Sequence, residues 1–587
     1  MPDKDSSPIE ERPTQAGPSR EVSVGTVATR YVPEIVLGFV APTGIRFAEV
    51  QKPVAERLRL YGYGVEEVRL SSWLSELAGM KDELRPEVRI PALQRAGDLA
   101  RTFAGSADAL AHVAIREIAD RRTMQNEAPP PKPKETQLPA VAYVVWSLKH
   151  KREVELLRQI YGSRFSLFSV YSPREARERQ LAEAIAAASR TTRPSKDYES
   201  RAKEIIDRDE YESLPGNFGQ NVRGAYPLAD FFIDASDGDR LKQWVNRSID
   251  IIFGHPFVTP TREELGMYIA HAAGLRSAEP GRQVGAAIAT AAGDIVAIGT
   301  NEVPAYKGGH YWSDPLNPHS PSDNREYLKE IDTSDATKRR LAAEIFEALK
   351  KSGAVGRALS DEAILEVLHT DDPERKKFAT EAIGVLREAG AFSRNLSDDD
   401  IYGSLEATGL VDLTEYGRAV HGEMSALMDA ARRGVNVSNE TMYVTTFPCH
   451  QCSRHIVASG LERVVYIYPY PKSRAEELHG DAIEIAESAT FDPHKVRYQS
   501  FIGVAPRMYP VAFAMTKRKD DETGKVVEAE DFMRSPRLPD EGPDGTWDVS
   551  AHVLREQKAN ETSKDWLAEV EVKVEAAMKE EQKSGIA

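Results

Sequence analysis

The chain has 587 residues, of which 41% are hydrophobic and 29% charged, a composition typical of a globular protein with a large core. Such a length favours roughly two to four domains. Its formal net charge of -16 argues against general nucleic-acid binding, because that binding relies on lysine and arginine to neutralise phosphates. No run approaches the ~18 apolar residues of a membrane-spanning helix, and residues 1–30 lack the apolar core of a signal peptide.

The N-terminal part of the chain is predicted to be a disordered tail at 1–30 followed by an α/β domain at 31–255. The tail is rich in proline, serine and acidic side chains. The domain alternates buried-strand runs with helical patterns, an order typical of a parallel sheet. Its predicted strands cover 34–40, 65–70, 140–146 and 165–171, with helices near 47–61, 153–161 and 239–253 and a proline-rich loop at 128–133.

The first predicted strand leads into Gly38-Phe-Val-Ala-Pro-Thr-Gly44, a turn whose backbone N–H groups can approach phosphates. Gly38 and Gly44 are therefore candidate nucleotide-binding residues, with Arg174 and Arg177 as a basic cover. The turn departs from the Walker A pattern G-x-x-x-x-G-K-[ST], because it is one residue too long and Ile45-Arg46 replaces the lysine and hydroxyl. The alternatives are a degenerate nucleotide site without ATP hydrolysis and a plain scaffold turn.

A second domain is predicted over 256–516, with a capped helix at 261–275 and a β-hairpin whose strands cover 284–290 and 294–300. Residues 303–420 form a large insertion that interrupts this domain. The insertion is predicted to hold helices at 337–351, 361–368 and 373–389, and a lid, an oligomer contact and an effector site are all compatible with it. The charged segment 517–587 is predicted to be a tail with one peripheral amphipathic helix near 566–578.

The two cysteines of the chain stand in Pro448-Cys449-His450-Gln451-Cys452, downstream of His421-Gly422-Glu423. In this H-x-E…P-C-x-x-C pattern a histidine and two cysteines hold Zn²⁺, while the glutamate is not a ligand and moves protons. Three protein ligands leave the fourth position of a tetrahedral zinc to water, as in catalytic sites. The predicted zinc ligands are therefore His421, Cys449 and Cys452, and the predicted catalytic residue is Glu423.

The cysteine pair is also compatible with a structural zinc site and with a redox pair. A structural zinc site needs four protein ligands, and only His450 or His455 is at hand as the fourth. A redox C-x-x-C pair needs no H-x-E partner. The surroundings favour the catalytic site, because Cys449 and His421 each open a predicted helix. A helix N-terminus favours the thiolate form of cysteine, which zinc requires. The N-termini of the two predicted helices can therefore converge on one metal ion.

Four stretches of the second domain are similar to the cytidine and deoxycytidylate deaminase family, and in particular to its deoxycytidylate branch. They are Leu275-Arg-Ser-Ala-Glu-Pro-Gly-Arg-Gln-Val-Gly-Ala286, Gly299-Thr-Asn-Glu-Val-Pro304, His421-Gly-Glu-Met-Ser-Ala426 and Pro448 to Cys452. The whole chain resembles the bacterial anti-phage dCTP deaminases, in which a P-loop-like domain precedes the deaminase. The resemblance implies an α/β protein with an N-terminal P-loop NTPase-like parallel-sheet domain and an αβα cytidine-deaminase-like domain carrying a large helical insertion.

The resemblance also implies roles for four more residues. Asn301 would hydrogen-bond the sugar, and its alternative is a turn residue after a strand. Arg276, Ser277 and Arg282 are candidate phosphate contacts, since arginine forks match phosphate oxygens, and their alternative is a plain role at a helix end.

The function implied by the resemblance is zinc-dependent hydrolytic deamination of dCTP and dCMP to dUTP and dUMP with release of ammonia, which would deplete the dCTP pool in antiviral (anti-phage) defence. The alternatives are a polynucleotide deaminase acting on single-stranded DNA or RNA, and a nucleotide- or RNA-responsive switch with a structural zinc domain. The resemblance further implies a homo-oligomer, a nucleotide at the N-terminal domain and restraint by an inhibitory small RNA. A cytoplasmic location is expected because the only thiols are predicted metal ligands.

Overall fold

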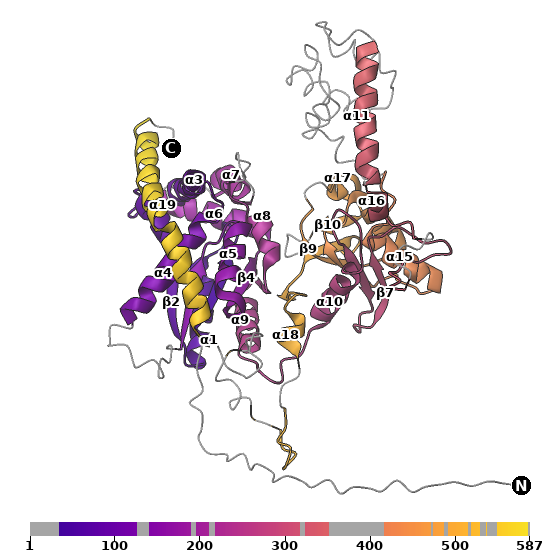
Figure 1. The fold of residues 1–587 in the computed structure, drawn as a ribbon, viewed down its shortest axis with the longest axis horizontal. Helices are drawn as coiled ribbons and strands as arrows, with labels where there is room; N and C mark the ends of the chain where they lie inside the picture. Colours follow the sequence, from indigo (N-terminus) through magenta and orange to yellow (C-terminus); the bar gives the residue numbers. More distant parts are fainter. Residues whose placement is uncertain are drawn as a thin grey trace, which may run out of the picture.

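The structure is a computed structural model, and it describes residues 34–125, 140–189, 195–210, 218–316, 323–330, 332–351, 416–470, 473–485, 491–514, 518–526, 528, 536 and 549–584. The predicted tail at 1–30, the loop at 128–133 and the insertion helices at 361–368 and 373–389 lie outside these residues. The described elements gather around two six-stranded sheets (Figure 1). Within them, no helix is both long and apolar enough to cross a membrane.

The first sheet has the strand order β12-β5-β4-β1-β3-β2. Its five parallel strands confirm the predicted parallel sheet: β1 (Ile35–Val40), β2 (Gly64–Arg69), β3 (Val141–Trp146), β4 (Phe165–Tyr171) and β5 (Phe231–Asp234). Every residue of β1 and β3 is buried, which explains why both read as continuous apolar runs.

Helices cover both faces of this sheet. On one face α1 (Phe47–Leu60) packs beside α9 (Gly238–Ile252), and on the other α4 (Ala109–Gln125) packs beside α5 (Lys151–Tyr161). The remaining helices surround the carboxyl ends of the strands; they are α2 (Leu70–Leu77), α3 (Pro86–Ala104), α6 (Arg174–Ala188), α7 (Glu199–Glu210) and α8 (Val222–Ala225). The sequence analysis did not predict α2, α3 or α4.

The second sheet has the order β10-β11-β9-β8-β6-β7. The predicted hairpin is present as the antiparallel strands β6 (Gly285–Ala289) and β7 (Ile295–Thr300). The other four strands run parallel to one another: β8 (Thr441–Thr446), β9 (Arg463–Tyr468), β10 (Ile483–Ile485) and β11 (Val496–Ser500).

The second sheet is the middle layer of an αβα sandwich, as predicted. One face packs on α10 (Arg262–Gly274), the other on α15 (Gly422–Arg433) and α16 (His450–Ser459). Glycines allow the close approach on both sides. A Cβ at Gly285 would meet the backbone of α10 at 1.9 Å, and one at Gly299 would meet the backbone of α15 at 2.2 Å. The described part of the insertion holds η5 (Glu326–Lys329) and α11 (Thr333–Lys351).

The C-terminal segment differs from the prediction of a peripheral helix. α19 (Val549–Ser584) lies along α3 and α4 of the front domain (Figure 1), and buries Leu567, Val570, Val574 and Met578 there. Its charged residues are also used inside the protein, because Arg122 of α4 bonds both Glu34 and Glu556. The front domain therefore includes α19.

The two sheets are joined by the chain that follows β11. β12 (Gly503–Val504) pairs antiparallel with β5, so a piece of the predicted second domain completes the first sheet. The Glu264 carboxylate of α10 accepts from the Val504 N–H at 3.0 Å and from Arg247 of α9. The short helices α17 (Ala475–His479) and α18 (Tyr509–Phe513) flank this junction in sequence.

Candidate metal centre and active site

The predicted metal ligands come from the N-termini of two helices on the same face of the second sheet. His421 is the N-cap of α15, and Cys449 is the N-cap of α16, which follows β8 directly. The Cys452 N–H points at Cys449 Sγ at 3.5 Å, so the first turn of α16 presents both sulfurs on one side. This arrangement is the one expected from the spacing of the motif.

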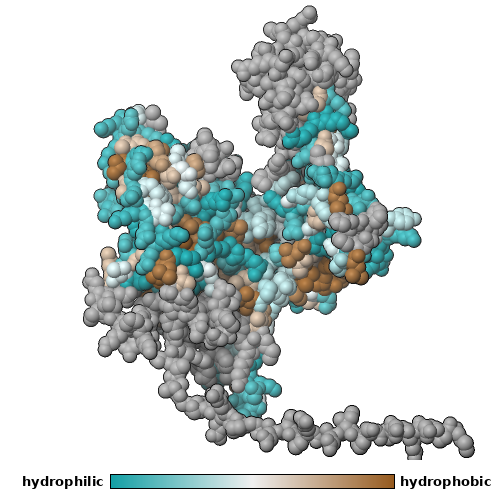
Figure 2. Space-filling view, viewed as in Figure 1, coloured by the Kyte–Doolittle hydropathy of each residue, from teal (hydrophilic) through white to brown (hydrophobic). Residues whose placement is uncertain are grey.

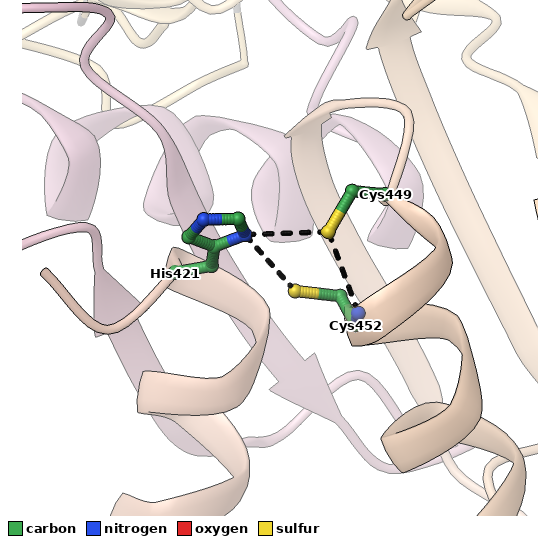
Figure 3. A group of neighbouring side chains, drawn as sticks. All are labelled: His421, Cys449 and Cys452. Atoms are coloured by element: carbon green, nitrogen blue, oxygen red, sulfur yellow. Dashed lines mark hydrogen bonds between the residues drawn. The ribbon is translucent and has the colours of Figure 1, made fainter. Parts of the chain in front are cut away.

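The three donor atoms form a compact group (Figure 3). His421 Nδ1 lies 3.4 Å from the sulfur of Cys449 and 3.4 Å from that of Cys452. A zinc ion with ordinary bond lengths and tetrahedral angles separates a nitrogen and a sulfur ligand by about 3.6 Å. The spacing therefore fits zinc, with the imidazole bound through Nδ1.

The donor set holds these three residues and no fourth among the described histidines, cysteines and acids. His450 and His455, the two candidates for closing a structural site, do not belong to it. Three protein ligands leave one position of a tetrahedral ion open, as a catalytic site requires.

The electrostatics of the group call for a cation. The contact with Cys452 and then that with His421 lower the pKa of the Cys449 thiol to about 4, despite its burial. The Cys449 sulfur and burial raise the pKa of Cys452 well above its ordinary value, because two adjacent thiolates repel each other. A bound divalent cation removes this repulsion and stabilises both thiolates.

Glu423 lies in the first turn of α15, two residues after the histidine ligand, and it is 4% exposed. Burial raises the pKa of its carboxyl to about 7, with His421 opposing the shift. A carboxyl with such a pKa exchanges its proton readily near neutral pH.

A cavity of about 440 Å³ opens beside the metal group. Its walls come from the α10–β6 loop, the end of β8 and the start of the insertion, and both His421 and Glu423 line it. The other lining residues are Glu279, Gly281, Arg282, Val284, Asn301, Asp332, Ser334, Lys338, Gly417, Ala419, Thr446, Phe447, Cys449 and Tyr470.

Two of the four predicted substrate contacts reach this cavity. Asn301 Nδ2 donates to the Arg282 carbonyl at 2.6 Å, and its Oδ1 accepts from the Val284 N–H at 2.7 Å. A carboxamide has two N–H bonds and two oxygen lone pairs, so Asn301 can shape the loop and still bond a ligand. The Arg282 side chain has no ion-pair partner among the described carboxylates.

The other two predicted contacts lie elsewhere. The Arg276 guanidinium stacks 3.6 Å from the Trp312 ring centroid and donates to the Tyr311 carbonyl at 3.0 Å. It lines a separate cavity of about 650 Å³, to which none of the metal ligands belongs. Ser277 is buried, and its hydroxyl donates to the Asn301 carbonyl at 2.6 Å. Both side chains are thus bonded within the protein and outside the cavity at the metal group.

The separate cavity is lined in part by exposed apolar side chains. Figure 2 shows hydrophobic residues gathered on the lower face of the second domain. Among its lining residues, the large apolar side chains of Ile298, Trp312 and Met428 are 48%, 73% and 55% exposed.

The sequence analysis missed three charged residues of the active-site cavity. Glu279 has its pKa raised to about 7 by burial and by the nearby acids Asp332, Glu326 and Glu302. Asp332 and Lys338 belong to the insertion, and Lys338 lies on α11. Glu279 lies within the family-like stretch 275–286, but the motif spacing assigns it no role, and Asp332 and Lys338 are far from the motifs in sequence.

The candidate nucleotide-binding residues of the front domain do not form one phosphate-binding turn. Gly38 lies inside β1 rather than in the turn, and a Cβ there would come within 2.9 Å of Phe165 and Leu148. Gly44 has φ +100° and sits against the backbone of Arg177. Arg177 bonds Glu210, as does Arg174, so both arginines are engaged within the protein.

Gly44 lines a cavity of about 410 Å³ at the carboxyl ends of β1, β2 and β3. Four of its lining residues are cationic, but Lys149 pairs with Asp209 at 2.9 Å and Arg101 with Glu153 at 2.7 Å. In addition, Gln94 and Gln220 are 4% exposed and each keeps a side-chain oxygen without a hydrogen-bond partner.

Comparison with known proteins finds similarity in the second domain. Residues 260–468 match the family model described as the cytidine and deoxycytidylate deaminase zinc-binding region. The deoxycytidylate deaminase of Enterobacteria phage T2 is 40% identical over 55 residues, which cover 9% of this chain and 29% of that protein. ComE operon protein 2 of Bacillus subtilis is 31% identical over 85 residues, 14% of this chain and 42% of that protein. The chain thus spans less than half the length of these relatives.

Among solved structures, the apo dCMP deaminase of the cyanophage S-TIM5 is similar over 41% of this chain and 99% of its own, with 12% identity and a TM-score of 0.19.

Proposed function

We propose that residues 260–468, a cytidine and deoxycytidylate deaminase zinc-binding region, catalyse the hydrolytic deamination of deoxycytidine nucleotides. The substrates are dCMP and dCTP, and the products are dUMP or dUTP with ammonia. The observation that carries this proposal is the meeting of three metal donors and a buried carboxyl, Glu423, at one cavity.

His421, Cys449 and Cys452 would hold Zn²⁺. When bound, this ion supplies Lewis acidity, which lowers the pKa of water to ~7 and makes it a nucleophile at neutral pH. The cavity walls position the cytosine ring and limit the access of bulk water to it.

Glu423 moves the protons of the reaction. Its carboxylate takes a proton from the attacking water and gives one to ring atom N3, so that the ring accepts oxygen at C4. It then transfers the second proton of the same water molecule to the exocyclic amine, and the C4–N bond breaks to release ammonia. The pKa of about 7 suits a group that must accept and return a proton in each cycle.

Asn301 and Arg282 bind the rest of the nucleotide. The amide of Asn301 holds the Arg282–Val284 backbone and keeps a second N–H for a sugar hydroxyl. The Arg282 fork is suited to phosphate oxygens.

A panel of substrates tests the proposal. Purified protein is incubated with dCMP, dCTP, cytidine and a single-stranded oligodeoxynucleotide, and the uracil products are measured by mass spectrometry. Turnover of dCMP and dCTP is expected. Turnover of the oligonucleotide alone would favour a polynucleotide deaminase, and release of ammonia from none would favour a switch with a structural zinc domain.

Nucleotide binding by the front domain stays a prediction. The cavity at Gly44, with its cationic residues and two unpartnered carboxamide oxygens, supports it. The place of Gly38 inside β1 argues against a phosphate loop that begins there. Titration of the intact Glu423→Gln protein with ATP, GTP and dATP at millimolar concentrations tests the prediction.

Three further expectations rest on the family resemblance. They are depletion of dCTP in defence against phage, restraint by a small RNA and assembly into a homo-oligomer. The exposed apolar side chains around Trp312 support the last of these, since large apolar patches mark interfaces.

A further inference from the structure

The active-site cavity is lined by acidic groups, so the negative charge of a nucleotide must be balanced by cations in its walls. Glu279, Asp332 and Glu423 place three carboxyl groups on its walls, and a phosphate carries negative charge as well. Like charges repel strongly in a partly buried site. The phosphates must therefore lie next to cations, and apart from the ligand His421 the lining cations are Arg282 and Lys338.

Lys338 is oriented into the protein. Its side chain is 12% exposed, although it belongs to a helix with an exposed neighbour, Asp335, at 58%. Lysines that serve in ordinary surface pairs of this protein differ from it: Lys573 and Lys579 on α19 are 48% and 67% exposed.

The only carboxylate paired with Lys338 among the described residues is that of Asp335, at 3.6 Å. The pairs of Lys573 and Lys579 are shorter, at 2.6 and 3.1 Å. The contact with Asp335 is therefore weak, and it leaves most of the hydrogen-bonding capacity of the ammonium group to a ligand.

The start of α11 is anchored to the segment that precedes the metal ligand His421. One oxygen of the buried Glu326 carboxylate accepts from the Thr333 N–H at 2.6 Å, and the other accepts from Arg418 at 3.0 Å. Arg418 precedes His421 by three residues in the chain. This bridge holds the first turns of α11, and with them Lys338, at a set place beside the cavity.

We infer that Lys338 recognises the phosphate groups of the substrate together with Arg282, and that the insertion thereby distinguishes nucleotides from nucleosides. The inference rests on the proposed deamination of deoxycytidine nucleotides. Arg282 comes from the α10–β6 loop and Lys338 from α11, so the two cations contact a phosphate chain from different walls of one cavity.

Steady-state kinetics with three substrates test the inference. Lys338→Met removes the charge and keeps the length of the side chain, and Lys338→Arg restores the charge. In Lys338→Met the KM for dCMP and dCTP should rise about tenfold or more, the loss of one charge-assisted bond, with kcat little changed. The KM for deoxycytidine should not change, and Lys338→Arg should recover most of the affinity for nucleotides.

The matched control is Arg340→Met, which removes one charge from the exposed face of the same helix, where Arg340 is 68% exposed. This variant should behave as the native protein. The inference is wrong if Lys338→Met has the same KM values as Arg340→Met. It is also wrong if Lys338→Met raises the KM for deoxycytidine as much as the KM for dCMP. Zinc content and circular dichroism of each variant check that the fold is intact.

A binding measurement separates this inference from the proposed reaction. In the Glu423→Gln background, dCMP, dCTP and deoxycytidine are titrated calorimetrically with and without Lys338→Met. Binding of nucleotides that depends on Lys338, in a protein whose native form releases no ammonia, would uphold the phosphate site and refute the deaminase. Nucleotide binding that is independent of Lys338, in a protein whose native form releases ammonia, would refute the phosphate site and uphold the deaminase.

Discussion

The two sheets each carry a cavity at the carboxyl ends of parallel strands, and the charges in the two cavities are balanced in different ways. In the front domain, Lys149 and Arg101 have carboxylate partners within the protein. At the metal centre, by contrast, Cys449 and Cys452 share a single imidazole. Charges that a protein does not neutralise itself are stabilised by a ligand, so the second cavity is the better candidate for chemistry.

The largest effect is expected at the sulfurs. Cys449→Ser or Cys452→Ser should abolish zinc binding, measured by elemental analysis, and should lower activity by more than the ~10- to 100-fold that follows loss of a ligand's hydrogen-bond partner. His450→Gln is the control, since His450 adjoins Cys449 but lies outside the donor set. Loss of zinc from the control would show that the site is closed and structural.

The next effect concerns Glu423, the proposed proton-transferring group. Glu423→Gln keeps the size of the side chain and removes its basicity, so zinc should remain bound while the rate falls by at least ~10²-fold. Single-turnover assays on protein of known zinc content measure this. Native turnover in the zinc-loaded variant would remove Glu423 from the mechanism.

In the front domain the paired charges should matter for stability and not for the metal. Arg122 is buried between Glu34 and Glu556, so Arg122→Met removes the arginine partner of two buried carboxylates. Glu34 keeps His552 and Glu556 keeps Tyr161, so the free energy of unfolding should fall by about 3 kcal/mol, the low end for a broken buried pair. Urea denaturation measures the change. Arg121→Met, at a more exposed pair, should cost less than about 1 kcal/mol.

The same network predicts how stability depends on pH. Burial alone raises the pKa of Glu34, but hydrogen bonds from His552 and Arg122 outweigh it and lower that pKa from 4.5 to about 2. Because the folded pKa is the lower one, the stabilisation is present above pH 4.5 and is lost as the pH falls toward 2. Hydrogen exchange of the α19 amides should show this loss of stability as the pH falls. In Glu34→Gln the pH dependence between 4.5 and 2 should be absent.

The smallest effect is expected at Arg276. Because its guanidinium lies on Trp312 in the separate cavity, Arg276→Ala should change the KM for dCMP by less than about twofold. Arg282→Ala, at the active-site cavity, should raise that KM. A large effect of Arg276→Ala would show that the two cavities act on one ligand.

Much of the fold could be predicted because the pattern of the residues is local. β1 and β3 are continuous apolar runs between turns, and their burial on both faces explains the pattern. Helices α3 and α4 were missed because each buries polar residues, such as Gln94 and Arg122, that obscure the apolar stripe. α19 looked peripheral for the same reason, since its buried Glu556 reads as a surface charge.

The sequence alone predicted the metal ligands His421, Cys449 and Cys452, which the structure brings together. The C-x-x-C spacing places both sulfurs on the first turn of α16, and His421 and Glu423 share the first turn of α15. The packing of both helices on one face of the second sheet then brings the two turns together. Only the tertiary structure decided which charged side chains line the cavity at the metal group. Lys338 enters the cavity and Arg276 leaves it through contacts between segments distant in the chain, and the spacing of residues carries no information about such contacts.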